Sequence, residues 1–339
     1  MSKAAIKSIF AVIIVFTGIN LAVSTVAIDE VRKKSEFTAT DLETVDAFIN
    51  ATFREMLEAP TITDSVKRRE DIMVRIARDG QEQYSRQFIE SVERNIASAL
   101  LKVDTWTDEK FITATKLNLA VIAGNLDSPA LLDDALEMKN TEEIGVWYWA
   151  LRAISGNNVV SFIKSNPNTE LTEDAIGWAM ELADGNTPII LEMVAEFAGK
   201  IDMVQSNDIL ATIAQTRIEA YENNLATQES ADGAILAIIA SRMSNAEAKQ
   251  KLAQPFATLT ANVLKKYLAG LSPDSPLGST SSTNLLTAIA NLEKNILPKL
   301  DINTNFTRAI ERKNVADFQA EYDKLSGELS EKIGADINA

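Results

Sequence analysis

The chain has 339 residues and a net charge of −15, with 33 basic against 48 acidic side chains, and it contains no cysteine or histidine. The two missing residue types exclude Ser-His-Asp triads, histidine-dependent zinc proteases, thiol nucleophiles and iron–sulfur clusters. The acidic balance argues against binding to nucleic acid or anionic lipid, because both need a basic protein surface.

The first 27 residues have the three parts of a secretory signal peptide. Lys3 and Lys7 give a basic start, residues 9–16 form an unbroken apolar core, and the segment ends at Thr25-Val26-Ala27. Small side chains at Thr25 and Ala27 suit the pockets of a signal peptidase. We therefore predict a signal peptide over 1–27, cleaved after Ala27, and a mature chain that is periplasmic or secreted.

An uncleaved membrane anchor is the alternative for this segment. Residues 9–27 are 19 residues long, close to the roughly 20 that an apolar helix needs to span a bilayer. In both cases the two lysines stay inside and the remainder lies outside the cytoplasm, so an inner-membrane anchored protein is the alternative location. A chain of this length can bury a core without disulfides, so its lack of cysteine fits the bacterial envelope.

Helical periodicity dominates the N-terminal region that follows, residues 28–103. Apolar residues recur every three or four positions, and no segment alternates as a β-strand would. This pattern predicts helices over 41–58, 63–79 and 82–103.

A Gly-Asn pair recurs through the region 104–270, each time between two apolar stretches. The glycines lie 32 and 29 residues apart, and the pairs are Gly124-Asn125, Gly156-Asn157 and Gly185-Asn186. Glycine after a helix adopts the left-handed conformation at little cost and reverses the chain. Ser128-Pro129 and Thr187-Pro188 then supply a cap and a first-turn proline for the next helix. Each unit is thus predicted to be a helix hairpin whose apolar face needs a neighbouring hairpin.

These hairpin units resemble the HEAT and armadillo-like helical repeat families over roughly residues 107–202. The units are shorter than typical HEAT repeats, and residues 157–165 leave room only for a short second helix. The resemblance implies an all-α fold, an irregular stack of antiparallel helix hairpins forming an α-α superhelix. It also implies a surface that binds another protein or a peptide.

Further helices are predicted over 205–223, 229–243 and 245–270. Proline, glycine, serine and threonine then crowd residues 271–283, which indicates a linker or exposed loop. The C-terminal region 284–339 is again helical, with helices expected over 284–297 and 306–334. The last helix is amphipathic, so it either packs back on the preceding helices or extends toward a partner; we favour packing.

Aromatic residues gather at Trp147-Tyr148-Trp149, and Trp178 occupies the corresponding place in the next unit. Neighbouring side chains on a helix point about 100° apart, so all three cannot face one core. We expect two of them to pack between hairpins and one to reach the surface or a groove. The main interpretation is core packing; the alternative is that Trp147, Tyr148, Trp149 and Trp178 form an anchor for a partner.

Composition does not exclude carboxylate chemistry, because glycosidases need only two acidic side chains. The candidate pairs are Asp133-Asp134, Glu142-Glu143 and Glu173-Asp174. Glu142-Glu143 and Glu173-Asp174 follow threonines at predicted helix starts, where acidic residues complement the helix dipole. They are therefore interpreted as structural.

The leading hypothesis is a non-enzymatic helical-repeat binding or scaffold protein of the bacterial envelope, with an unidentified protein or peptide partner. The sequence predicts no catalytic residue, cofactor or metal site. Membrane contact is expected only through the N-terminal segment, if that segment stays uncleaved. The alternatives are an exported carboxylate-dependent hydrolase on a helical scaffold and a membrane-anchored structural protein of the envelope.

Overall fold

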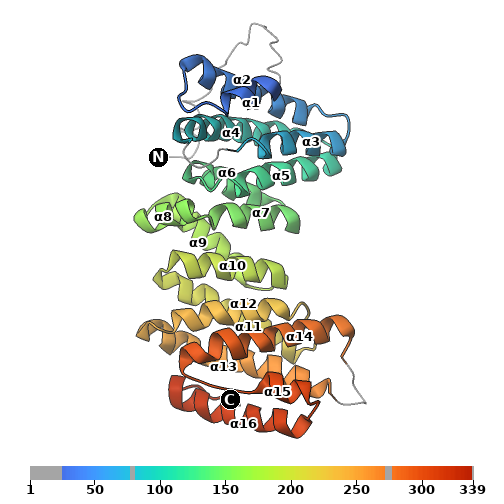
Figure 1. Ribbon diagram of the computed structural model, residues 1–339, viewed down its shortest axis with the longest axis vertical. Helices are drawn as coiled ribbons and strands as arrows, with labels where there is room; N and C mark the ends of the chain where they lie inside the picture. Colours follow the sequence, from blue (N-terminus) through green and yellow to red (C-terminus); the bar gives the residue numbers. More distant parts are fainter. Residues whose placement is uncertain (1–24, 77–80, 272–276, 338–339) are drawn as a thin grey trace.

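A computed structural model describes residues 25–76, 81–271 and 277–337. These residues form sixteen α-helices and no β-strand, which confirms the predicted all-α class. The helices are stacked along one long axis, with the N-terminal helices at one end and the C-terminal helices at the other (Figure 1). No helix in this part of the chain is both long and apolar enough to cross a membrane.

The N-terminal helices match the predicted ones closely at their starts. The predicted helix 63–79 ends early, at Met73, and is followed by a turn in which Val74 is exposed and Arg75 is buried. Arg75 is 7% exposed there and donates to both carboxylate oxygens of Asp29, at 3.0 and 3.1 Å. The helices of this region are α1 (Thr25–Val31), α2 (Ala39–Leu57), α3 (Ile62–Met73) and α4 (Glu82–Val103).

Residues 1–24, which hold most of the predicted signal peptide, lie outside the described residues. Ala27, the predicted cleavage position, lies within α1, and the next residue, Ile28, is fully buried. Cleavage after Ala27 stays a prediction.

The middle of the chain is a series of α-helices that range from 6 to 24 residues in length. The first Gly-Asn pair is followed by short helical turns rather than by one continuous helix. The elements are α5 (Glu109–Gly124), η1 (Pro129–Leu131), α6 (Leu132–Glu137), η2 (Met138–Asn140), α7 (Ile144–Ile154), α8 (Asn157–Ser165), α9 (Glu170–Ala183), α10 (Pro188–Ile201), α11 (Val204–Glu222), α12 (Ser230–Arg242) and α13 (Ala246–Ala269).

The helices pack in two rows that run along the long axis. In the first row α3, α5, α7, α10, α12 and α14 contact one another in that order. In the second row the order is α4, α6, α9, α11, α13 and α16. The short helix α8 contacts α7 and α10 and interrupts the alternation between rows. The resemblance to HEAT and armadillo proteins, and the irregular stack of antiparallel helix hairpins, stay predictions.

The three Gly-Asn turns are not equivalent in this arrangement, contrary to the predicted repeat. Gly124 and Gly156 lie at the ends of α5 and α7, both in the first row, whereas Gly185 follows α9 of the second row. Because α8 adds a helix between α7 and α9, the third pair falls on the opposite chain reversal. Similar local sequences thus serve different junctions.

The C-terminal region departs from the prediction at two places. Helix α14 starts at Ser279, so the last five residues of the predicted loop 271–283 are helical. The predicted helix 306–334 is broken around Lys313, whose φ is 51°, and Asn314 caps the second piece. This second piece, α16, packs back on α13, as favoured from the sequence. The elements are α14 (Ser279–Asn291), η3 (Leu292–Ile296), η4 (Leu297–Leu300), α15 (Phe306–Glu311) and α16 (Val315–Ile333).

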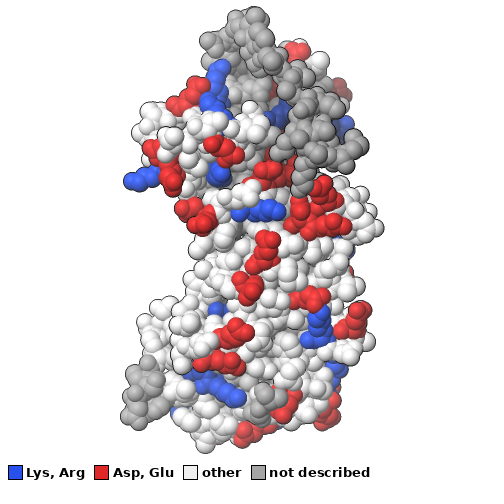
Figure 2. All heavy atoms as spheres, turned by 180° about the vertical axis from the view of Figure 1, so that it is seen from behind, with Lys and Arg blue, Asp and Glu red and all other residues white. Residues whose placement is uncertain are grey.

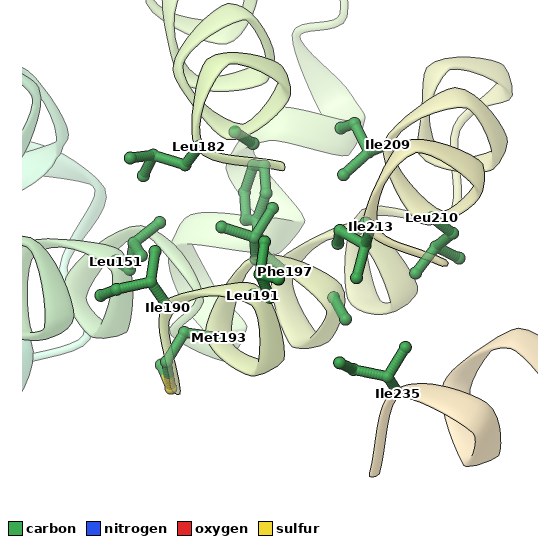
Figure 3. Close-up of a cluster of buried hydrophobic side chains, with 14 of the residues drawn as sticks. Leu151, Leu182, Ile190, Leu191, Met193, Phe197, Ile209, Leu210, Ile213 and Ile235 are labelled. Carbon is green, nitrogen blue, oxygen red and sulfur yellow. The ribbon is translucent and has the colours of Figure 1, made fainter. Parts of the chain in front are cut away.

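A continuous hydrophobic core lies between the two rows. Figure 3 shows its middle section, where side chains from α7, α9, α10, α11 and α12 meet. Phe197 and Ile213 are fully buried at this junction. Each helix thus buries its apolar stripe against both the opposite row and its neighbours, which is how a stack of short helices becomes stable.

Candidate functional site

The aromatic segment, Trp147-Tyr148-Trp149 on α7, lies on the boundary between core and surface. All three side chains are partly buried against the hydrophobic core, so the expected division into two packed and one exposed is wrong. The rings of Tyr148 and Trp149 meet edge to face, with centroids 5.7 Å apart. Trp178 is 3% exposed, so it belongs to the core and cannot extend an exposed aromatic face.

A pocket of about 320 Å³ opens beside the aromatic segment, where the C-terminal ends of α5, α7 and α10 lie side by side. We call it the turn pocket. It brings together two of the three Gly-Asn pairs, whereas Gly185 and Asn186 are not among its lining residues. These are Gly124, Asn125, Asp127, Arg152, Ser155, Gly156, Asn157, Met193, Glu196 and Lys200.

The glycines of the turn pocket are needed for close approach. Among the glycines of the three Gly-Asn pairs, Gly185 alone has the predicted left-handed conformation. A Cβ atom at Gly124 would lie 2.9 Å from the carbonyl oxygen of Trp149 and 3.0 Å from its Cε3 atom. A Cβ atom at Gly156 would collide with the Asp127 carboxylate. Both glycines therefore allow α5 and α7, with their turns, to pack together at this edge.

Replacing Gly124 by alanine is expected to destabilise the protein by about 1–3 kcal/mol, because the backbone of α7 would have to move. Gly177→Ala is the matched control, since Gly177 lies inside α9 with nothing within 4 Å of an added Cβ. That control should stabilise by up to about 1 kcal/mol through helix propensity. Urea denaturation of both variants checks the prediction, and equal effects of the two would contradict it.

Asp127 serves as an internal anion at the start of α8. Its Oδ1 accepts hydrogen bonds from the backbone N–H groups of Asn158, at 2.9 Å, and Val159, at 3.4 Å. The φ of Asp127 is 44°, a left-handed conformation that aspartate tolerates better than most residues. The turn after α5 therefore caps the start of α8, which lies more than 30 positions later in the sequence.

The two cations of the turn pocket differ in their partners. The Lys200 Nζ lies 2.6 Å from a Glu196 carboxylate oxygen and donates to the Ser155 carbonyl at 2.9 Å. The Arg152 guanidinium lies 5.4 Å from the Trp149 ring centroid and makes no hydrogen bond or ion pair with any described residue. The Ser155 hydroxyl is likewise without a hydrogen-bond partner in the described chain, and Ser155 is 2% exposed.

Arg152, Asp127, Ser155, Glu196 and Lys200 were not singled out from the sequence. The signal available there is weak: Arg152 is a cation in the last turn before a Gly-Asn pair, a place where cations commonly complement the helix dipole. Lys200 contacts a residue 45 positions away, which no local pattern reveals.

The carboxylates proposed for a hydrolase lie on three separate elements. Glu142 and Glu143 are exposed just before α7, and Glu173 and Asp174 are exposed on α9. On α6, Asp133 is exposed and Asp134 is buried. Figure 2 shows acidic side chains spread along the length of one face, consistent with a solvated surface.

Burial raises the pKa of Asp134 to about 7, with further contributions from Asp133, Glu93 and Glu137. Its Oδ2 has no hydrogen-bond partner within the described residues. A neutral, buried carboxyl of this kind is found at some catalytic sites, but it also arises wherever packing encloses an acid.

Several carboxylates do converge in a larger, open groove of about 860 Å³ between α2 and α3. Three of them are paired with cations: Arg68 lies 3.1 Å from Glu55 and 3.0 Å from Asp71, and Lys67 lies 3.4 Å from Asp64. Hydrogen bonds from Thr61 and then Lys67 hold the pKa of Asp64 below its usual value. A carboxyl with a lowered pKa, such as Asp64, does not make the general acid that glycoside hydrolysis needs.

The described residues contain no group of three or more acidic side chains placed to hold a metal ion. No protein-family model matches the sequence, and no curated protein shows significant similarity to it. The geometry of the turn pocket and its neighbours is therefore the basis for a functional proposal.

Proposed function

We propose that this chain is an exported, non-enzymatic binding or scaffold protein of the bacterial envelope that contacts a protein or peptide at the turn pocket. The observation that carries the proposal is Arg152, an exposed guanidinium that stacks on Trp149 and has no partner among the described residues. Arginine and tryptophan are the residues most often found at the centres of binding interfaces.

The surroundings of Arg152 also support a binding role. The pocket volume of about 320 Å³ falls at the lower end of the range for small-ligand sites, enough for the end of a chain or one side chain. The half-buried aromatic segment beside it offers apolar area at little cost in conformational entropy. Asn125 and Asn157 at its edge are exposed and can pair with peptide groups.

A photo-crosslinking amino acid placed at Asn157 in growing cells tests the proposal. We expect defined crosslinked products at this position, weakened when Arg152 is replaced by glutamine. Asn295, an exposed asparagine on η3, is the matched control position and should give none of these products. Crosslinking at Asn157 no stronger than at Asn295 would refute the proposed site.

The protein purified from the same cells reports on export. Mass spectrometry should show that its N-terminal peptide begins at Ile28, as cleavage after Ala27 requires. A chain that begins at Met1 and sediments with membranes would instead support the anchored alternative.

A further inference from the structure

The charged groups that line the turn pocket are satisfied within the protein, with one exception. Asp127 accepts from two backbone N–H groups of α8, and Lys200 pairs with Glu196 at 2.6 Å. Arg152 alone has no anionic partner in the described chain. The pocket therefore presents one guanidinium whose hydrogen-bond donors are unmatched, although its two cations and two carboxylates sum to zero charge.

The guanidinium of Arg152 is suited to a planar, singly charged anion. Its N–H groups form a fork that matches the two oxygens of a carboxylate. Stacking on the Trp149 ring, 5.4 Å from its centroid, limits the orientations of the fork before any ligand arrives. Ser155 lies one turn further along α7, lines the same pocket and has a buried hydroxyl without a partner among the described residues.

The rest of the pocket argues for a peptide end over an inorganic anion. Asp127 and Glu196 are themselves negative and line the same pocket, so a dianion such as phosphate meets more repulsion than a monoanion. The exposed amides of Asn125 and Asn157 can pair with peptide N–H and C=O groups. Met193 is 8% exposed and adds an adaptable apolar surface.

We propose that the turn pocket binds the C-terminal carboxylate of a peptide or protein, with Arg152 holding the two carboxylate oxygens. This inference rests on the proposed function and names the chemical group that the same pocket recognises. The residue before the carboxylate then lies beside Met193 and the aromatic segment, and the preceding peptide groups run past Asn125 and Asn157.

Titration of the full-length protein with three probes tests this assignment. The probes are acetyl-trialanine with a free C-terminus, the same peptide as its C-terminal amide, and inorganic phosphate. Binding is followed by the indole N–H resonances of the tryptophans in heteronuclear NMR spectra. We expect the free acid to shift one indole resonance in a saturable way. The amide and phosphate should bind at least about tenfold more weakly than the free acid, because each lacks the singly charged planar group.

Two arginine variants provide the matched comparison. Arg152→Gln should lose the response to the free acid by at least about tenfold. Arg308→Gln, at an exposed arginine on α15, should respond as the wild type does. Thermal unfolding of both variants controls for folding, and Arg152 is exposed, so neither variant is expected to melt differently.

Equal binding of the acid and the amide, an equal or stronger response to phosphate, or no response to any probe would each overturn the carboxylate assignment. Such results would leave the proposed function intact if crosslinks at Asn157 still form and still depend on Arg152. Absence of those crosslinks, together with a selective response to the free acid, would instead refute the protein partner and keep the carboxylate site.

Discussion

Replacing Asp134 by asparagine is expected to make the protein more resistant to unfolding at pH 8 than at pH 5, relative to the wild type. Asp134 is 8% exposed, and its Oδ2 lacks a hydrogen-bond partner in the described structure. Burial, followed by the charges of Asp133, Glu93 and Glu137, raises its pKa to about 7. The wild type must therefore either keep this carboxyl protonated or bury a charge.

The direction of the pH effect follows from proton binding. In the unfolded chain the carboxyl ionises near 3.8, the ordinary pKa of an aspartate, whereas in the folded protein it stays neutral up to about pH 7. The folded state holds one extra proton between these values, so stability falls as pH rises through this window and is lowest above pH 7. Over pH 5 to 8 the loss from this one group is about 2–3 kcal/mol, and asparagine removes it.

Urea denaturation of both proteins at pH 5 and pH 8 measures the effect. The free energy of unfolding of the variant, minus that of the wild type, should rise by about 2–3 kcal/mol between these pH values. Asp133→Asn is the control: it removes the same charge from the neighbouring exposed position and should show little pH dependence. A difference that does not change with pH would show that Asp134 is ionised in the folded protein.

Replacing Asp232 by asparagine is expected to cost about 3–5 kcal/mol, the range found when one partner of a buried ion pair is removed. Asp232 on α12 is fully buried and receives hydrogen bonds from Arg217 at 2.6 and 3.0 Å. The Tyr221 hydroxyl donates to the same carboxylate at 2.6 Å. Asparagine would leave Arg217, 3% exposed, without a counter-charge.

The large loss of stability expected for Asp232→Asn depends on burial of the ion pair. Two further variants test this dependence: one removes a carboxylate from an exposed pair, and the other replaces both members of the buried pair by apolar residues. Asp208→Asn removes a carboxylate from an exposed pair with Lys251 and should cost no more than about 1 kcal/mol. The double variant Arg217→Met, Asp232→Leu should recover much of the loss, because no unpaired charge remains. Urea denaturation of all three variants is the measurement, and a cost below about 1 kcal/mol for Asp232→Asn would contradict the prediction.

A neighbouring carboxylate shows the same dependence on partners. Burial alone would raise the pKa of Glu229, yet hydrogen bonds from Lys266 and Ser281 keep it below the usual value. Glu229 is 1% exposed and joins the α11–α12 connection to α13 and α14. Asp232 thus binds α12 to α11, and Glu229 connects the chain reversal after α11 to the C-terminal helices.

Local sequence was sufficient to predict most helices. The predicted helix 82–103 coincides with α4, and the helices predicted over 205–223 and 245–270 differ from α11 and α13 by one residue at each end. These segments carry their own apolar periodicity and end at residues that favour turns. Where long-range partners intervene, as for Arg75 after α3, the predicted boundary moved by several residues.

The turn pocket shows where local reasoning stops. Gly124, Asn125, Gly156 and Asn157 were picked out by their repetition, and the structure places all four around one pocket. Their predicted role as left-handed turns was wrong, because the structure uses the glycines for close packing and Asp127 for the cap. Trp178 is buried, as the main interpretation of core packing expected, and the alternative of a partner-binding face shared with Trp149 does not hold for it, because α9 belongs to the other row.

By itself, the sequence determined that this protein is all-helical, acidic and without histidine or cysteine chemistry, since these properties depend on residue types and on periodicity over a few turns. Tertiary structure alone decided that Arg152 has no partner in the described chain, that Asp134 is enclosed and that Asp232 is paired. The physical reason is that burial and charge pairing are set by contacts between different helices, which the periodicity of each helix does not specify.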